Sequence, residues 1–528
     1  MERRGAASSL FIKIRNSMKK FLLTLTLTLT LTLTFAQDIY QVAELSATDL
    51  NGTSRYVGMG GAMSSLGGDL SVMSSNPAAI GLYRHNDVAV TASLVSMPGS
   101  HKFDGDKPTY VSFDQIGFVY SMPSSGGSLR YFNFGLNYHK HHDFNQLLNA
   151  DNELGAAGNA SQTWQLADLC NSWGGAESAT PLADMAYSAY LLGEDGGDYT
   201  AYNAARNAYG RSRTGSNQAL DLNFSLNFND QYYLGLTVTG YNVRQKSYMA
   251  YGEDLLTADL VDDGYYLMDN EGKLTGNGVD VKLGFLVRPI QESNFKIGVT
   301  LTTPTYYELT YRNDLLLGSY TDSYGEVEPR GYYFDYDYNV RTPWKVGVSL
   351  GNTFFNRLAL GAEYEFADYS TCSVSYGDDY WDDWDWRHKT KDRELNKQLD
   401  KYLKGTHTLK FGAELMVTPN LYLRGGYNHV TSAIEKDAWL NHFINSPSVD
   451  VASNTDYLNL GAVNRYSAGI GLKFGKFYAD ATWLYQHQRG TLYTFNAEDP
   501  ATPGINACPP NRLKLNRSQV MLTMGYRF

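Results

Sequence analysis

Cysteine is scarce in this chain and irregularly placed. The 528 residues contain three cysteines, Cys170, Cys372 and Cys508. They lie far apart and are odd in number, which matches neither a disulfide framework nor the ligand spacing of a metal site. We therefore interpret them as incidental, and the sequence predicts no bound metal and no cofactor.

Long apolar runs and an excess of basic residues are also lacking. Beyond the N-terminal region no run of about 18 apolar residues occurs, so no spanning helix is expected. Hydrophobic residues make up 43% and the mean hydropathy is -0.37, which is polar for a bundle of membrane helices. The net charge is -11. Because nucleic-acid binding depends on neutralising phosphates, this charge argues against a nucleic-acid partner.

Tyrosine and glycine are the abundant residues, at 41 and 50 copies. Moderate hydropathy with many tyrosines suits a transmembrane β-barrel, in which only every second strand residue faces lipid. It suits a large soluble β protein equally well. Composition alone therefore leaves the two classes open.

The N-terminal region has the three parts of a secretory signal. Met18-Lys19-Lys20 is basic, Phe21 to Phe35 is apolar and threonine-rich, and the small residue Ala36 follows. This order predicts a signal peptide over residues 1–36, with translation starting at Met18 and the mature chain at Gln37. A retained membrane anchor is the alternative, but about 15 residues are short for a spanning helix.

The rest of the chain alternates between apolar and polar residues, the signature of β-strands. The clearest case is the end of the chain, where Val520, Leu522, Met524, Tyr526 and Phe528 alternate with more polar residues. Such segments predict about fourteen strands, with ends uncertain by a few residues. They are expected near 86–97, 112–122, 128–140, 216–228, 231–248, 276–289, 293–312, 331–350, 357–375, 404–417, 420–431, 461–474, 476–491 and 516–528.

The gaps between these strands alternate between short and long. Short turns are expected at 123–127, 229–230, 291–292, 355–356, 418–419 and 475. All other gaps are long, and the longest, 141–215, is predicted to hold short helices at the cell surface. Outer-membrane barrels have this pattern because their strands are antiparallel, with short periplasmic turns and long extracellular loops. The sequence therefore predicts an all-β, antiparallel transmembrane barrel over residues 83–528.

Residues 37–82 precede the first strand and differ from the rest. They contain Gly58, Gly60 and Gly61 and, further on, Asn76-Pro77-Ala78. A phosphate-binding loop is excluded, because no preceding strand and no Gly-Lys-Ser/Thr accompany the glycines. About fourteen strands enclose a lumen wider than wall side chains fill. We expect residues 37–82 to plug it.

These motifs resemble a known family. Tyr56-Val57-Gly58-Met59-Gly60-Gly61-Ala62 and Ser75-Asn76-Pro77-Ala78 look like the FadL/TodX family of outer-membrane hydrocarbon and long-chain fatty acid transporters, in its branch common in Bacteroidetes-type bacteria. The motif resemblance covers about residues 54–95. It implies a fourteen-stranded barrel with an N-terminal hatch that includes Asn76, Pro77 and Ala78. It also implies passive uptake of hydrophobic compounds and their lateral exit into the membrane.

Two further assignments follow from the resemblance. The family's lateral gap arises at a kink in the third strand, where Gly135 is the only glycine between Leu129 and Lys140. Glycine weakens a strand locally, and an ordinary small residue facing the lumen is the equal alternative. The alternating end with Tyr526 and Phe528 looks like the signal that the barrel-assembly machinery reads in many outer-membrane barrels.

Two other segments suggest chemistry. Tyr138-His139-Lys140-His141-His142 has histidines close enough to bind a metal or haem iron, although a solvated strand end is the more common interpretation. Residues 376–386 alternate aspartate with Tyr and Trp. They suit Ca²⁺ binding or an apolar landing site, and an acidic loop beside an aromatic belt is favoured. No Gly-x-Ser-x-Gly nucleophile motif occurs, so we do not expect an enzyme.

Three functional hypotheses remain. The first is an outer-membrane transporter of small hydrophobic ligands, fatty acids or hydrocarbons, set in outer-membrane lipid. The second is a barrel that binds a partner or acts as a secretion shuttle, using its long loops. The third is a porin, which the expected plug disfavours. The sequence does not name the ligand.

Overall fold

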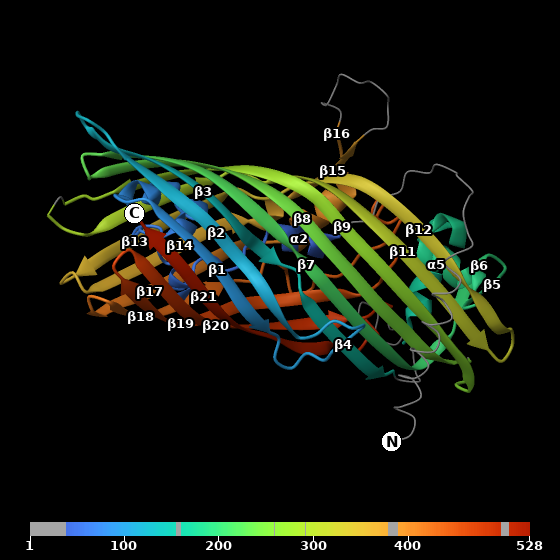
Figure 1. The fold of residues 1–528 in the computed structure, drawn as a ribbon. Helices are drawn as coiled ribbons and strands as arrows, with labels where there is room; N and C mark the ends of the chain where they lie inside the picture. Colours follow the sequence, from blue (N-terminus) through green and yellow to red (C-terminus); the bar gives the residue numbers. More distant parts are fainter. Residues whose placement is uncertain (1–37, 155–159, 258, 291, 378–388, 498–505) are drawn as a thin grey trace.

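The computed structural model describes residues 38–154, 160–257, 259–290, 292–377, 389–497 and 506–528. The chain forms a closed barrel of strongly tilted strands, with the hatch inside it and helices beyond one end (Figure 1). No helix among these residues has the length and apolar character needed to cross a membrane. The predicted signal peptide lies outside the described residues.

Fourteen antiparallel strands form the wall, as predicted. The barrel closes where β1 pairs with β21, from Asp87 with Arg527 to Ser96 with Ser518. The wall strands are β1 (Asp87–Ser96), β2 (Thr109–Pro123), β3 (Leu129–Asp143), β7 (Asn203–Phe228), β8 (Tyr232–Leu256), β9 (Asp262–Val287), β10 (Lys296–Thr302), β13 (Lys345–Phe354), β14 (Leu358–Asp368), β17 (Gly405–Thr418), β18 (Leu421–Val430), β19 (Tyr457–Phe474), β20 (Phe477–Tyr493) and β21 (Asn511–Arg527).

The wall is taller on one side than the sequence predicted. Beyond β10 the chain continues as β11 (Tyr306–Thr321), which pairs with the outer half of β9 and with β12 (Gly325–Arg341). Pro304 and Pro343 lie in the breaks before β11 and after β12. Because proline has no N–H for the ladder, it interrupts a strand at these points. The segments predicted as single strands at 293–312 and 331–350 are therefore each two strands.

The range 141–215 was expected to be a loop, and this is partly wrong. It contains β4 (Gln146–Glu153), which pairs with the first half of β7, so β7 begins at Asn203 rather than near 216. Between these strands lie α4 (Gln162–Trp173), η3 (Ala176–Ser178), α5 (Pro181–Ser188) and a small hairpin of β5 (Leu192–Asp195) and β6 (Asp198–Ala201). Periodicity missed the extensions because their residues are polar on the outer face.

The short turns have the conformation that tight hairpins need. Asn229 and Asp230 have φ of 55° and 57°, and Phe355 and Asn356 have φ of 53° and 54°. Two consecutive residues with positive φ form the turn whose twist matches the flanking strands. The predicted tight turns at these positions are confirmed, and they lie together with the C-terminus at one end of the barrel (Figure 1).

The outer face is apolar and the inner face largely polar. In β21, Val520, Leu522 and Met524 are 55%, 48% and 57% exposed. Thr523 between them is fully buried, and so is Met521, which packs against the hatch. This inverts the pattern of a soluble protein and is typical of a strand that faces lipid. The barrel therefore spans a membrane.

The hatch and two outer segments complete the fold. The hatch consists of α2 (Ile39–Ser46), α3 (Ser54–Gly58), η1 (Leu70–Ser74) and η2 (Pro77–Leu82), which lie within the barrel in Figure 1. Farther along the chain, the connection from β14 to β17 contains η4 (Tyr369–Thr371), β15 (Ser373–Gly377), β16 (Lys389–Lys391) and α6 (Arg393–Tyr402), and α6 contacts α2.

Candidate functional site

A row of wall glycines supports the hatch backbone. Gly351, Gly361, Gly412 and Gly426 are successive register partners across β13, β14, β17 and β18. A Cβ on Gly361 would overlap the carbonyl oxygen of Ala62, and the three other glycines face neighbouring hatch backbone in the same way. Since a side chain in this row would displace the hatch, the wall is built to hold its backbone at close range.

The predicted glycines of the hatch lie against this row. Gly60 and Gly61 have φ of 62° and 82°, which side-chain-bearing residues rarely adopt. A Cβ on Gly60 would also lie 2.7 Å from the backbone nitrogen of Tyr427, and one on Gly58 would lie 2.9 Å from Thr482 Oγ1. Gly60 and Gly61 therefore serve the turn, Gly58 and Gly60 serve close packing on the wall, and Gly61 packs on Leu50 within the hatch.

The Asn76-Pro77-Ala78 motif lies against a second pair of wall glycines. Asn76 Oδ1 accepts a hydrogen bond from Ala78 N at 3.1 Å, which caps the short helix η2. Gly235 and Gly284 are register partners in β8 and β9, and a Cβ on either would overlap this motif. The motif is buried, and the structure gives it a packing role in the hatch.

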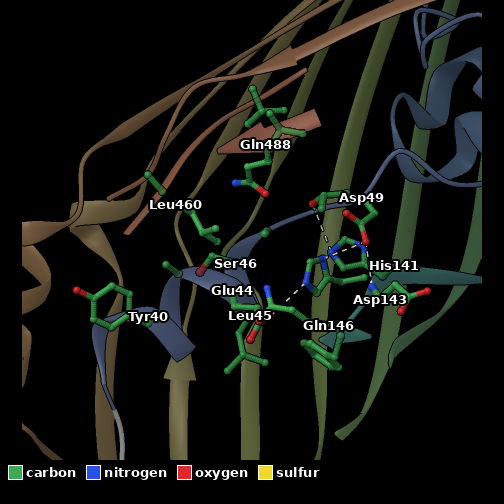
Figure 2. A pocket seen from close by; sticks show the side chains of 18 of the residues that line it. Tyr40, Glu44, Leu45, Ser46, Asp49, His141, Asp143, Gln146, Leu460 and Gln488 are labelled. Carbon is green, nitrogen blue, oxygen red and sulfur yellow. Dashed lines mark hydrogen bonds and ion pairs between the residues drawn. The ribbon is translucent and has the colours of Figure 1, made fainter. Parts of the chain in front are cut away.

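A partly open cavity of about 450 Å³ lies beside the hatch and is lined by hatch, wall-strand and loop residues. Figure 2 shows Tyr40 and Leu460 on one side of it and Asp49, His141 and Asp143 on the other. The cavity is therefore lined by aromatic and aliphatic groups such as Tyr40 and Leu460, by the charged cluster opposite them, and by Asp38 and Asp456. A pocket with both kinds of lining suits a ligand that has an apolar body and a polar end.

The charged cluster ties the hatch to the wall. Arg465 lies 3.2 Å and His142 Nδ1 lies 3.3 Å from the Asp49 carboxylate. Glu44 of α2 pairs with Arg213 and lies 3.9 Å from His142 Nε2. Burial alone would raise the pKa of Glu44, but the charges of Arg213 and His142 hold it at about 2. Both hatch carboxylates thus stay ionised at neutral pH.

The three clustered histidines contact different residues. His139 Nε2 lies 3.0 Å from Asp221, His142 faces Asp49, and His141 lies edge-on to Tyr241 with 5.0 Å between ring centroids. His139 is 6% exposed, so the interpretation of a solvated strand end is wrong. Within the described ranges, no group of three or more His, Cys, Asp or Glu side chains is arranged to hold a metal ion.

Gly135 lies in a regular part of β3. It pairs with Val119 on one side and Asn223 on the other. The register shifts between β3 and β7 occur at 129–131 and 140–142 instead. A Cβ on Gly135 would overlap the terminal methyl of Met73 in the hatch. The structure therefore shows a socket for Met73 here, and the lateral kink stays a prediction.

The C-terminal residues complete the barrel seam. Phe528 N donates to Asn86 O at 3.1 Å, and Phe528 O accepts from Asn86 N at 3.1 Å. Tyr526 stacks on Phe528 with 5.8 Å between ring centroids, and both lie at the end with the tight turns. The role of Tyr526 and Phe528 as an assembly signal stays a prediction. Most of the acidic aromatic segment, 378–388, lies outside the described residues.

Sequence reasoning missed the charged contacts of the lumen. Glu44, Asp49, Arg213, Arg465 and Arg517 were not singled out, although they border the cavity. A signal was present, because a charged residue at an inward position of a barrel strand must face the lumen. Their pairing was not readable, since the partners lie 93 or more positions apart in the sequence, as Asp49 and His142 do.

Comparison with solved structures shows the fold. A Pseudomonas aeruginosa FadL homologue is similar with a TM-score of 0.51 and 14% identity, covering 91% of this chain and 99% of that chain. The CymD monoaromatic hydrocarbon channel gives 0.48 and 10%, covering 91% and 98%. The P. putida toluene transporter TodX gives 0.47 and 13%, covering 91% and 99%. No protein-family model and no curated protein matches the sequence.

Proposed function

We propose that this outer-membrane barrel takes up small hydrophobic compounds passively and is not an enzyme. The cavity beside the hatch carries the proposal, because it lies inside the barrel and offers both apolar and charged side chains to one ligand. The barrel and hatch have the fold of a FadL homologue, and the hatch motifs resemble that family. Together these features favour a transporter over a porin.

The lining favours an amphiphile such as a long-chain fatty acid over a plain hydrocarbon. Lys345 borders the cavity, and its Nζ donates to Ser46 O at 3.2 Å and Thr48 Oγ1 at 2.9 Å. None of the ion pairs among the described residues involves Lys345. A cation without a paired carboxylate suits an acidic head group, while Tyr40 and Leu45 would contact the chain.

The route from this cavity has two steps in our proposal. The hatch moves away from the glycine row, and the ligand then leaves sideways into the membrane at β3, near Gly135. Lateral exit suits an apolar ligand, because it never crosses the aqueous periplasm.

Insertion of the barrel by the assembly machinery, directed by Phe528, belongs to the same proposal. Deleting Phe528 should lower the folded, heat-modifiable fraction, and an unchanged yield would contradict that role.

Lipids retained by the purified, folded barrel test the ligand. Mass spectrometry should detect a long-chain acid, and Leu45→Trp should lower its retained amount severalfold by filling the cavity. Leu94→Trp is the matched control, because Leu94 is 51% exposed on the lipid face. Absence of any retained amphiphile, together with equal uptake by both variants, would contradict the proposal.

One observation favours the alternative of a partner-binding or secretion-shuttle barrel. Helices α4 and α5 pack with the extended wall strands into one hydrophobic cluster, which includes Leu166, Leu182, Tyr251, Tyr266 and Leu492. A folded cap of this size offers a rigid surface to a protein partner. Removing residues 162–188 separates the two functions, because ligand retention should survive if the cap serves a partner.

A further inference from the structure

The apolar belt on one side of the barrel ends at a definite level. On β8, β9 and β11 the continuous outward apolar stretch ends at Val238, Val279 and Tyr306, which are 36%, 48% and 56% exposed. These strands lie side by side in Figure 1 and run on well beyond the belt. From there as far as Lys246, Lys273 and Arg312 the outward positions carry no large apolar side chain, so we expect them to face the head groups and sugars of the outer leaflet.

Three basic residues form a row across these strands. Lys246 of β8 is the register partner of Lys273 of β9, and Lys273 is the partner of Arg312 of β11. All three are exposed on the outer face, and Arg244 lies two residues nearer the belt on β8. Like charges directly opposite each other destabilise a sheet. A row of them is tolerable where an anionic partner lies against it.

The carboxylates around this row leave most of its basic side chains free to bind an anion. Arg312 lies 3.3 Å from Asp335 at its far end. Glu271 and Asp314 occupy the next outward row, two residues farther from the belt. No ion pair with a carboxylate is found for Arg244, Lys246 or Lys273 within the described part of the chain.

The loop between β1 and β2 borders the same face. Phe103 stacks on Tyr248, the outward neighbour of Lys246, with 5.7 Å between ring centroids. The loop also carries Lys102 and Lys107, both exposed. It therefore encloses one side of the basic row, and its two lysines are balanced by Asp104 and Asp106.

We propose that this basic face, formed by Arg244, Lys246, Lys273 and Arg312, binds the phosphate groups of a phosphorylated glycolipid of the outer leaflet. Six residues separate Lys273 from Val279, which is about 20 Å along the strand and, given the usual tilt, about 15 Å above the belt. That height suits phosphates attached to the lipid's sugar head group and core. The bidentate geometry of Arg and the point charges of Lys both recognise phosphate.

Native mass spectrometry of the folded barrel, titrated with lipid A, tests the proposal. Bisphosphorylated lipid A should bind about tenfold more tightly than its dephosphorylated form, and inorganic phosphate should not compete. Lys246→Gln/Lys273→Gln should lower the affinity about 25-fold, since each of the two lysines near an anionic surface contributes about fivefold. The control is Lys473→Gln/Lys476→Gln at the opposite end of the barrel, which should bind as the unmodified protein does.

Two results would overturn the proposal. One is equal affinity for the phosphorylated and dephosphorylated lipids, and the other is unchanged affinity in the folded double variant. Heat-modifiable migration in gels shows whether that variant folds, and Lys273→Gln alone replaces it if it does not. Ligand uptake through the lumen should be the same in all variants, so this test is independent of the proposed function.

Discussion

Arg55 of the hatch forms a two-pronged ion pair with Glu414 of β17. Its Nε and Nη2 each donate to a carboxylate oxygen at 2.8 Å. Arg424 of the wall approaches the same carboxylate at 2.6 Å and Asp480 at 2.5 Å. Buried charges are stable only when paired, so this four-residue network fixes the hatch to the wall near the turns.

Removing Arg55 should loosen the hatch while leaving the barrel intact. Arg55→Ala takes one partner from a buried pair, a change that destabilises by about 3–5 kcal/mol in other proteins. The strands keep their own hydrogen bonds, so the barrel should still fold. Conductance in a planar bilayer should rise above that of the unmodified protein.

Arg84 supplies the matched control for this experiment. It pairs with Asp230 at the turn end of the barrel, where the two side chains are 30% and 49% exposed. Such a pair contributes about 0–1 kcal/mol. Arg84→Ala should therefore leave conductance unchanged, and equal leakage from both variants would show that Arg55 does not hold the hatch.

A methyl group should disturb the hatch when it is added to the glycine row, but not when it is added to the neighbouring Gly425, which does not face the hatch. Gly412→Ala places a Cβ against the carbonyl oxygen of Met59, whereas Gly425→Ala on the adjacent strand meets no atom within 4 Å. Forcing a methyl group into a packed contact costs about 1–3 kcal/mol. We expect Gly412→Ala to leak ions and Gly425→Ala to stay closed. Similar conductance of the two would mean that the hatch does not depend on close contact with the wall.

Lowering the pH should weaken the ion pairs that hold helix α2 to the barrel wall. The pKa of Glu44 is held at about 2 against an ordinary value of 4.5. Because the folded value is depressed, the stabilising contribution of Glu44 is present above about pH 4.5 and is lost as the pH falls towards about 2. Conductance of the native barrel should rise across this window.

Glu44→Gln separates this effect from general acid unfolding. The variant lacks the charge at every pH, so its conductance at neutral pH should already be raised and should change less between about pH 4.5 and 2. Heat-modifiable migration at each pH reports whether the barrel itself stays folded. A native protein with constant conductance throughout the window would exclude the role given to Glu44.

The barrel was predictable from the sequence because its signals are local. Alternation in a segment such as 520–528 and the positive-φ turn at Asn229 and Asp230 depend on neighbouring residues. The extension of β7 to Asn203 was not predictable, because its outward residues face water and lose the alternation. The Arg55–Glu414 pair was not predictable either, since 359 positions separate the two residues. The hatch motif Asn76-Pro77-Ala78 was recognisable, but its seat on Gly235 and Gly284 required the register of β8 and β9.

Substitutions at Gly135 and Met73 can distinguish two roles for Gly135: a flexible point in a lateral gate, or a space that admits the Met73 side chain. If Gly135 serves mainly to admit the Met73 side chain, Gly135→Ala should displace the hatch, raise conductance and impair uptake, because its Cβ would overlap the Met73 methyl. Met73→Ala removes the opposing atoms, so the double variant should regain the closed state and normal uptake. Additive effects of the two substitutions would instead indicate that they act independently.

Lateral exit at β3 that depends on a flexible backbone at Gly135, rather than on withdrawal of Met73 from it, would give the opposite pattern. If uptake requires a flexible backbone at Gly135, alanine should slow ligand uptake without raising conductance, and Met73→Ala should not restore the rate. Uptake of a fluorescent fatty acid and bilayer conductance, measured on the same four proteins, separate the two roles. We expect rescue by Met73→Ala, because β3 pairs regularly with both neighbours at Gly135 and the nearest atoms to the missing side chain belong to the hatch.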